Sequence, residues 1–459
     1  MRNLVWFRSD LRTLDNQALH SALESGETHA CIFLPVSQLV KYGHGERKIH
    51  FLRNSCQRLS SRLKELGISV TSEEVDNFDT QEDCILNLCR EQGIKQVFWN
   101  NEYPLDERRR DLQLEKKLEA LGIQARRFDD SLILPPHQIS TGKGEFYRVF
   151  TPFKRAWISC FEQQRSALIE KLDPLDKPST EIQTVKKFVT GQINNYKNQR
   201  DFPVLDATSH ISACLSAGTV SPLRALAEAL ASNRGDINGG SEGISSWISQ
   251  LIWREFYYHL IARCNPISKN QPFIEATNNL NWNAPDSALE RWKEGDTGIP
   301  IVDAGMRQLL ISGWMHNRLR MITAMFLSKN LFIDWRYGEK HFLQHLQDGD
   351  FALNNGGWQW SASTGTDAAP YFRVFNPFTQ AQRFDPDARF IKQFVPELES
   401  LPADVIHSET KLARHRPESY PEALVNTVES RKKAIAAFKN LNSPIKKSNP
   451  GYSMQELHK

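Results

Sequence analysis

Residues 348–372 concentrate side chains that could hold a polar ligand. The stretch reads DGDFALNNGGWQWSASTGTDAAPYF and contains aspartates, asparagines, adjacent glycines and tryptophans. Its opening Asp348-Gly-Asp350 resembles a calcium-binding EF-hand loop, but Leu353 stands where that loop needs glycine, and Gln359 where it needs a bidentate glutamate. A calcium loop is therefore excluded. The mixture of carboxylate, amide, bare backbone and indole favours a flat organic ligand instead.

A second polar and aromatic group lies on a predicted helix within residues 242–264. Residues three and four apart are neighbours on a helix, so one face carries Trp247, Gln250, Trp253, Arg254 and Tyr257. The aromatic residues alone would be ordinary core, but buried glutamine and arginine need partners. Two interpretations stay open here: a core helix with internally paired polar groups, or the wall of a ligand site.

The segment WMHNRLRM, residues 314–321, shows a similar mixture. Asn317, Arg318 and Met321 cluster on one side of a predicted helix, with Arg320 between the two sides. The opposite stripe is apolar and should face the core: Met315, Leu319, Ile322 and Phe326. Either a solvated charged face or a cavity wall would explain the polar side.

Basic and aromatic residues also alternate in FYRVFTPFKRAW, residues 146–157. Lys154 and Arg155 lie in this segment, and Arg200 follows in a polar stretch. Such a combination suits contacts with nucleic-acid phosphates, although a plain solvated face would look the same.

The composition limits what kind of protein can carry these groups. The chain has 459 residues, 40% of them hydrophobic and 24% charged, with a net charge of +3, so it should form two or three globular domains. No apolar signal region and no 18-residue apolar run is present, which predicts a soluble, cytoplasmic protein without a membrane segment. The seven cysteines lack C-x-x-C spacing, so we expect reduced thiols and no metal site.

Hydrophobic periodicity divides the chain into an α/β part and an all-α part. Within residues 1–130, apolar runs at 4–7, 30–36, 68–70, 96–100 and 123–128 alternate with helical patterns, which predicts a doubly wound parallel sheet. The clearest helical stripe is Leu52, Cys56, Leu59, Leu63 and Leu66. No G-x-G-x-x-G follows the first apolar run, so a dinucleotide is not indicated there.

The rest of the chain is expected to be a connector followed by helices. Residues 131–200 contain the helix-breaking runs LPPHQISTGKG and DPLDKPST, so we interpret them as an interdomain connector. Residues 201–441 carry helical patterns at 221–231, 242–264, 300–313, 314–335 and 429–440. Residues 442–459 are polar and predict a frayed tail.

Several long motifs show a resemblance to a known family. FRSDLRTLDNQAL, YRVFTPFKRAW, SQLIWREFYYHL, GWMHNRLRMITAMFL and the opening stretch continued to FNP are all typical of it. The chain resembles the DNA photolyase/cryptochrome family, and most closely the bacterial class I cyclobutane pyrimidine dimer photolyases. The resemblance covers nearly the whole length, and implies an α/β antenna domain followed by a helical FAD-binding domain.

The resemblance implies a set of FAD-binding residues in the helical part. Motif by motif, the phosphate and ribityl site would comprise Tyr196, Thr208, Ser209 and Ser212, while Trp247 and Arg254 would flank the cofactor. Arg320 would pair with Asp348, Asp350 would bond the flavin's pyrimidine-like edge, and Asn354 would face its N5 atom. Because glycine has no Cβ, we expect Gly356 and Gly357 to let the backbone approach the flavin closely.

The resemblance also implies a light-driven lyase that acts on UV-damaged DNA. Excited reduced FAD would pass an electron to a cyclobutane dimer extruded from the helix, a step this enzyme class shares with other base-flipping proteins. An electron relay to the flavin would comprise Trp358, Trp335 and Trp282. The dimer would pack on Trp253 and Trp360, and its pocket would be completed by Gln250, Asn317, Arg318 and Met321.

Two further implications concern the surface and the antenna. Phosphates would be contacted by Lys154, Arg155, Arg200 and Arg318. An antenna pterin, 5,10-methenyltetrahydrofolate, would be held by Asp106, Glu107 and Lys269, although the family often has asparagine where Asp106 stands. We expect the protein to work as a monomer.

Three alternatives remain beside this interpretation. A cryptochrome light sensor is disfavoured by Asn354, since many cryptochromes carry Asp or Cys there, and by the short stretch after the last predicted helix. A (6-4) photolyase is disfavoured by WMHNRLRM, which is His-rich in those enzymes, but favoured by Gln250, where cyclobutane-dimer photolyases usually carry glutamate. A flavin electron-transfer protein would not bind DNA at all.

Overall fold

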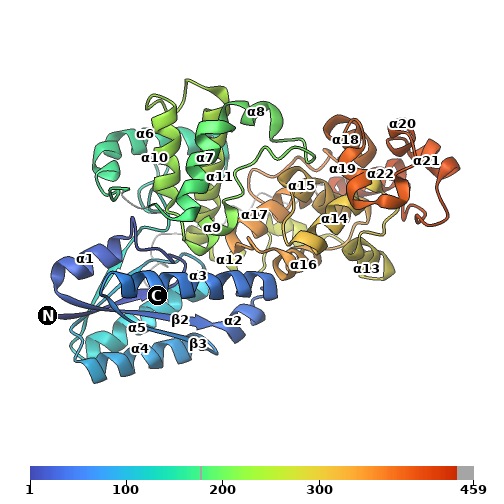
Figure 1. Ribbon diagram of the computed structural model, residues 1–459. Coiled ribbons are helices and arrows are strands. Elements are labelled where there is room, and N and C mark those ends of the chain that lie inside the picture. Colours follow the sequence, from blue (N-terminus) through green and yellow to red (C-terminus); the bar gives the residue numbers. More distant parts are fainter. Residues whose placement is uncertain (176–177, 442–459) are drawn as a thin grey trace.

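The five apolar runs of the first 130 residues pair into one parallel sheet, as predicted (Figure 1). The structure is a computed structural model that describes residues 1–175 and 178–441; the predicted tail at 442–459 lies outside the described residues. The sheet order is β3-β2-β1-β4-β5, and every neighbouring pair is parallel. The strands are β1 (Arg2–Phe7), β2 (Glu27–Pro35), β3 (Ser69–Val75), β4 (Gln96–Asn100) and β5 (Gln124–Phe128).

Both faces of this sheet are covered by helices, because successive residues of the buried central strand point to opposite sides. Leu4 and Trp6 belong to one apolar cluster, and Val5 and Phe7 to another. The covering helices are α1 (Gln17–Ser25), α2 (Val36–Lys41), α3 (Glu46–Glu65), α4 (Phe78–Gln92) and α5 (Leu105–Ala120). The predicted α3 stripe is buried except for Leu66, which is 50% exposed because the helix ends at Glu65.

Residues 131–200 differ from the connector that the sequence predicted. They contain two long helices, α6 (Phe150–Ile169) and α7 (Thr180–Gly191), whose apolar residues join the core around α11. The helix-breaking runs lie in the turns that flank these two helices. Their proline and glycine residues therefore mark the ends of helices, and not a connector without secondary structure. The helical part of the molecule therefore extends N-terminal to the predicted boundary.

Fifteen further α-helices follow among the described residues. They form a green group above the sheet and an orange-to-red group beside it (Figure 1). Their bounds are α8 (Tyr196–Gln199), α9 (Ser212–Ala217), α10 (Pro222–Ser232), α11 (Glu242–Arg263), α12 (Asn265–Ser268), α13 (Ser287–Glu294), α14 (Pro300–Ser312), α15 (Asn317–Met325), α16 (Trp335–His345), α17 (Phe351–Ala362), α18 (Pro377–Phe384), α19 (Arg389–Phe394), α20 (Ala403–Ile406), α21 (Glu409–His415) and α22 (Thr427–Leu441).

The helix expected over residues 314–335 is divided. After α15 the chain makes a π-helical turn, Phe326–Asn330, and α16 begins only at Trp335. The π turn directs the fully buried Lys329 to Ser363, with 2.7 Å between Nζ and Oγ. The predicted apolar stripe of this segment is confirmed, since its four residues are all buried.

The two parts of the molecule meet through specific contacts. Arg47 of α3 donates to the carbonyl oxygens of Leu309 (3.0 Å) and Leu310 (2.6 Å) at the end of α14. A Cβ on Gly45 would lie 1.8 Å from the carbonyl oxygen of Gln344, so only glycine permits this approach. No helix of the described residues is long and apolar enough to span a membrane.

Candidate functional site

The segment that opens α17 is fixed at both of its aspartates. Asp350 caps the helix, because one carboxylate oxygen accepts from the backbone N–H of Leu353 (3.0 Å). Its other oxygen accepts a hydrogen bond from the hydroxyl of Tyr258 on α11 (2.5 Å). Both aspartates are buried, at 7% exposure, and Asp348 accepts two bonds from Nη2 of Arg320 (2.8 and 3.0 Å). The predicted Arg320–Asp348 pair is thus present.

Asn354 has a defined amide orientation. Its Nδ2 donates to the backbone carbonyl oxygen of Glu339 on α16 (2.9 Å). Since a carbonyl only accepts, the amide nitrogen must face Glu339, and Oδ1 is left as a free acceptor. The side chain can therefore receive a ring N–H from a bound molecule.

The two neighbouring glycines serve different purposes. A Cβ on Gly356 would lie 2.2 Å from a ring carbon of Tyr257, whereas a Cβ on Gly357 would meet no atom within 4 Å. The close approach at Gly356 is therefore to Tyr257 and not to a ligand, which corrects that expectation. Gly357 faces open space.

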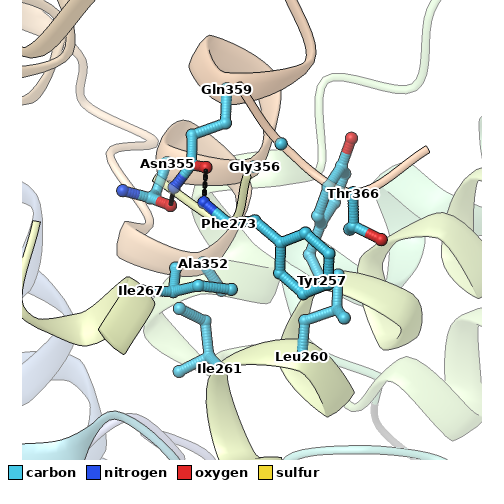
Figure 2. A pocket seen from close by; sticks show the side chains of 11 residues that line it. Tyr257, Leu260, Ile261, Ile267, Phe273, Ala352, Asn355, Gly356, Gln359 and Thr366 are labelled. Atoms are coloured by element: carbon cyan, nitrogen blue, oxygen red, sulfur yellow. Dashed lines mark hydrogen bonds between the residues drawn. The ribbon is translucent and has the colours of Figure 1, made fainter. Parts of the chain in front are cut away.

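A chain of buried amides lies beneath α17 (Figure 2). Asn355 donates to Oε1 of Glu339 (2.8 Å) and accepts from Gln359 (2.8 Å), whose Oε1 accepts from the backbone N–H of Phe273 (2.9 Å). They border a cavity of about 20 Å³, which Tyr257 also lines. Burial raises the pKa of Glu339 to about 7, and the hydrogen bond from Asn355 only partly opposes this shift.

Helix α11 brings several predicted residues toward this segment. Nε1 of the buried Trp247 donates to Oγ of Ser209 (3.2 Å), so two predicted cofactor residues are in contact. Arg254 donates to the carbonyl oxygen of Ser131 (3.1 Å), and its guanidinium lies 4.5 Å from the ring centroid of Tyr258. Its Nε is buried without a hydrogen-bond partner in the described part of the chain, which leaves one donor for an added acceptor.

The remaining predicted phosphate-site residues come from the chain between α7 and α9. Tyr196 is buried beneath Arg200, whose guanidinium lies 5.6 Å from its ring centroid. Thr208 is partly buried, and Ser212 begins α9. The ring of Tyr196 packs edge-on against Phe188 of α7 (6.0 Å), a helix that the sequence did not predict.

The predicted substrate residues occupy partly exposed positions on α11, α15 and α17. Trp253 stacks on Phe150 with 3.7 Å between ring centroids and 9° between planes, so one indole face is already covered. Gln250 makes a long contact to the carbonyl of Ser246 (3.4 Å), and Asn317 contacts the sulfur of Met321 (3.7 Å). Trp360 is partly buried at the end of α17.

The predicted phosphate-contacting cations differ in their surroundings. Arg155 is exposed and Arg200 partly buried, while Lys154 donates to Ser249 (2.7 Å). Arg318 pairs with Asp201 (2.8 Å) and lies over the ring of Phe384 (4.2 Å). Its charge is therefore already balanced inside the protein.

The three predicted relay tryptophans belong to separate aromatic contacts. Trp358 packs against Phe342 (4.9 Å) and Trp292 (5.9 Å), and Trp335 lies under the guanidinium of Arg336 (4.9 Å). Trp282 packs on Phe332 (4.8 Å) and is partly exposed, whereas Trp335 and Trp358 are buried. Burial thus decreases toward Trp282, as a path to the surface requires.

A larger cavity, of about 170 Å³, lies between the α/β domain and the helices. It opens beyond the carboxyl ends of β1 and β4, where the strand order reverses and ligands bind in open α/β sheets. From the sheet side it is lined by Arg8, Ser9, Glu102, Tyr103 and Arg110, and from the helical side by Ser216, Arg254, Tyr258 and Asp350.

The charges on the sheet side of this interdomain crevice are paired. Arg8 bonds Asp111 (2.6 Å), and Arg110 bonds both Glu102 (2.7 Å) and Asp111 (2.8 Å). Burial alone would raise the pKa of Glu102, but the guanidinium groups and a hydrogen bond from Ser9 outweigh it and hold that pKa at about 2. Glu102 is therefore ionised at neutral pH.

Of the three predicted antenna residues, Glu107 alone lines the crevice. Asp106 is exposed and accepts from the hydroxyl of Tyr42 (3.0 Å), while Glu107 lines the cavity. Burial, with the charge of Glu102, raises the pKa of Glu107 to about 7. Lys269 is exposed just after α12, a helix that Arg108 of α5 ties to the α/β domain through Asn265 (2.6 Å).

Sequence reasoning missed three groups at these sites, of which two are buried and Tyr258 is partly buried. Tyr258, Lys48 and Glu339 each contact a partner far away in the sequence, which periodicity within one helix cannot reveal. Lys48 of α3 donates to Ser216 of α9 (2.7 Å), and burial lowers its pKa to about 8 despite the nearby Asp350 and Asp348. A charged or phenolic residue inside an apolar helix face was the available signal.

The described helices and strands form an α/β domain that is joined to a helical domain. Residues 3–177 match the family described as DNA photolyase, and residues 247–440 match the FAD binding domain of DNA photolyase. The chain belongs to this family, which confirms the resemblance and the predicted fold class. Within the described residues no cluster of three or more His, Cys, Asp or Glu side chains could hold a metal ion.

Among its relatives, deoxyribodipyrimidine photo-lyase of Escherichia coli strain K12 is 40% identical over 466 residues, covering 95% of this chain and 98% of that protein. Among solved structures, a bacterial class III photolyase from Agrobacterium tumefaciens superposes with a TM-score of 0.82 at 31% identity, covering 96% of this chain and 98% of that one. A cryptochrome from Synechocystis also superposes, with a TM-score of 0.82 at 26% identity, covering 95% and 99%.

Proposed function

We propose that this protein is a deoxyribodipyrimidine photo-lyase, which uses light and FAD to split cyclobutane pyrimidine dimers in UV-damaged DNA. The observation that carries the proposal is the convergence of Arg320–Asp348, Asp350 and Asn354 at the start of α17, in a chain that belongs to the DNA photolyase family. The protein acts as a monomer in the cytoplasm, with damaged DNA as its partner and no metal.

The residues present fit a bound flavin. Arg254 has a buried Nε without a partner in the described chain, Asn354 keeps a free acceptor, and Gly357 faces open space. The cofactor would be held at its phosphates and ribityl chain by Tyr196, Thr208, Ser209 and Ser212, and at its ring by Trp247, Arg254, Asp350 and Asn354. When bound and reduced, FAD supplies the photoexcited electron that opens the cyclobutane ring.

The protein's own contribution is to hold charges and protons in place. The bidentate Arg320–Asp348 pair fixes the loop before α17, so Asp350 and Asn354 need no reorganisation during the reaction. Oδ1 of Asn354 is oriented so that it would accept from a ring N–H, and it would therefore favour the form of the cofactor that carries this proton.

The lesion pocket would be formed by Gln250, Trp253, Asn317, Arg318, Met321 and Trp360. Trp253 would stack the lesion on the indole face opposite Phe150, which is worth about 1–3 kcal/mol per base and helps offset the unstacking of a damaged site. Lys154, Arg155 and Arg200 would contact the phosphates around it. Arg318 would act there by orienting Asp201 and the pocket wall together, since it is paired in the protein.

Two accessory elements complete the proposal. Trp358, Trp335 and Trp282 would carry electrons from the surface to oxidised FAD. Asp106, Glu107 and Lys269 would hold 5,10-methenyltetrahydrofolate at the mouth of the crevice, with Glu107 as the group that enters the cavity. The pterin would absorb light and pass the excitation on to FAD.

Gln250 favours a second candidate, a (6-4) photolyase, because that branch usually carries glutamine at this position. One experiment separates the two functions. Purified protein is reduced, mixed with DNA that carries a single cyclobutane or (6-4) lesion, and illuminated. Repair of the cyclobutane lesion alone, together with flavin absorption bands, is expected; repair of the (6-4) lesion alone would overturn the substrate assignment, and repair of neither would favour a cryptochrome.

A further inference from the structure

Two tyrosines at the domain boundary, one buried and one partly buried, each donate their hydroxyl proton to a carboxylate. Tyr258 of α11 donates to Asp350 (2.5 Å), and Tyr103, which follows β4, donates to Asp129 (3.0 Å). Their rings pack edge to face, with 6.2 Å between centroids and 82° between planes. Tyr103 is only 5% exposed, and both rings border the interdomain crevice. A phenol chain with a proton acceptor at each step therefore reaches Asp350.

Phenols and indoles differ in what they need to give up an electron. An oxidised tyrosine ring is a strong acid, so the electron leaves readily only when a base takes the proton. Asp350 and Asp129 are such bases, each within hydrogen-bond distance. An oxidised indole can keep its proton, and Nε1 of Trp358 is buried without a partner in the described chain. We therefore expect the tryptophans to pass electrons without protons. The two tyrosines, by contrast, can each release an electron together with a proton.

The charges around Tyr258 reinforce this coupling. The Arg254 guanidinium, 4.5 Å from the ring centroid, disfavours a positively charged ring. Burial and the charge of Asp350 raise the pKa of Tyr258 well above its ordinary value, so the phenol stays protonated until it is oxidised. Glu102 faces the same ring from the α/β domain, and Lys48 faces Asp350. Loss of the proton to Asp350 is thus the only way to avoid a second positive charge beside Arg254.

We propose that Tyr258 and Tyr103 form a second electron route to the cofactor, in which each electron is accompanied by a proton. The inference rests on the proposed function, because it requires flavin beside Asp350. Tyr258 gives one electron to photoexcited oxidised flavin and its Oη proton to Asp350, which leaves a neutral tyrosyl radical.

Tyr103 then restores Tyr258. It gives one electron to the Tyr258 radical and its own proton to Asp129, while Asp350 returns the first proton to Tyr258. A thiol reductant in solution finally supplies an electron to Tyr103, Asp129 returns its proton to Tyr103, and the thiol loses its own proton to solvent. One thiol hydrogen is consumed for each electron delivered, so charge and protons balance.

The test uses full-length protein in which Trp358→Phe closes the indole route. Oxidised protein is illuminated with and without thiol, and radicals are followed by electron paramagnetic resonance, with ring-deuterated tyrosine incorporated to identify phenoxyl signals. We expect the W358F variant to show a tyrosyl radical signal in the paramagnetic resonance spectrum, and this signal should become narrower when the tyrosine rings are deuterated. The signal should be absent from the W358F/Y258F double variant. Flavin photoreduction in W358F should fall about tenfold further when Tyr258→Phe is added.

Two additional variants make the result specific. W358F/Y103F should keep a signal, now confined to Tyr258 and shorter lived. W358F/Y371F is the matched control, since Tyr371 stacks on Phe438 away from the crevice and its loss should leave the signal unchanged. The tyrosine route would be overturned if the tyrosyl signal of W358F persisted after Tyr258 was replaced, or if no tyrosyl signal formed while flavin was bound. Neither result would affect the proposed function. Absence of bound flavin in the wild-type protein would overturn both the tyrosine route and the proposed function.

Discussion

Glu102, partly buried in the interdomain crevice, and Glu339, buried between α16 and α17, have pKa values shifted in opposite directions from the ordinary glutamate value. The pKa of Glu102 is about 2, because the guanidinium groups of Arg8 and Arg110 outweigh the effect of burial. The pKa of Glu339 is about 7, because burial dominates and its direct partner is the amide of Asn355.

The difference reflects two ways of building a buried polar region. The crevice balances full charges against one another, so each group depends on its partners being present. The α17 region is built mainly from amides and backbone groups, with one bidentate ion pair at its edge. The first arrangement gives strong fields at a domain boundary. The second gives a neutral surrounding in which an electron can move without large electrostatic rearrangement.

Removing the acid from the crevice should have the largest effect. Glu102→Gln leaves Arg8 and Arg110 to share Asp111, and should lower the free energy of unfolding at pH 7 by about 3 kcal/mol, since each pKa unit is worth about 1.4 kcal/mol. Because the folded pKa lies below the ordinary 4.5, this stability is present above pH 4.5 and is lost as the pH falls toward about 2.

Urea unfolding of both proteins from pH 2 to 8 measures this difference. Glu74→Gln is the control, because Glu74 is an exposed glutamate paired with Arg53 and should change little. A wild-type advantage that is independent of pH would show that the ionisation of Glu102 contributes nothing.

The acid beneath α17 should respond in the opposite direction. Glu339→Gln keeps the acceptor for Asn355 and removes the buried ionisation, so the variant should be about 3 kcal/mol more stable than wild type at pH 8. Since the folded pKa is raised above 4.5, wild type loses stability as the pH rises toward about 7, and the two proteins should converge at pH 4.

The same unfolding series compares these two proteins, with exposed Glu399→Gln as the control. A variant that is less stable than wild type at every pH would mean that Glu339 is ionised and paired in the folded state, and the contrast with Glu102 would then disappear.

The proposed tryptophan relay should carry electrons from the surface to the flavin. Trp282→Phe removes the partly exposed end of the proposed relay, and photoreduction of oxidised FAD with a reductant present should fall at least about tenfold, or about 1.4 kcal/mol in barrier. Trp314→Phe is the control, because that indole packs on His210 outside the relay. Photoreduction that proceeds equally well in the two variants would remove Trp282 from the relay.

The smallest effect is expected where a new acid enters the neutral region. Gln250→Glu exchanges one neutral hydrogen bond for another if the added carboxyl is protonated like Glu339, so DNA affinity should change by about 1 kcal/mol or less. The acidic proton should instead raise the repair yield per photon modestly, by sharing charge as it develops on the dimer. Titration of single-lesion DNA and repair per absorbed photon measure the two quantities; tighter binding without improved yield would contradict this role.

The sequence predicted the parts of this contrast that depend on local pattern. All five strands follow from apolar runs, and the Arg320–Asp348 pair follows from motifs that the chain shares with its family. Helices α6 and α7 were missed because proline-rich turns flank them, and because aromatic residues of α6 were interpreted as a nucleic-acid surface.

The charge pairings were not predictable in the same way. Arg110 and Glu102 are close in sequence, but Arg8 joins them only because β1 and β4 are neighbours in the sheet. Tyr258 meets Asp350 only because α11 crosses the start of α17. Periodicity identifies which face of a helix is buried, but not which distant group that face will meet.

The π turn at residues 326–330 has a consequence for how this chain tolerates changes in length. The turn closes α15, and the chain after it is irregular up to Trp335, so no second half of the same helix follows. A single-residue deletion within the turn would shift each later residue by one position, which is about 100° around a helix axis. Lys329 would then swing away from Ser363, and the stretch leading to Trp335 would change phase with the rest of the domain. We therefore expect natural length variation to spare this turn and to collect in the loops around α20 and α21.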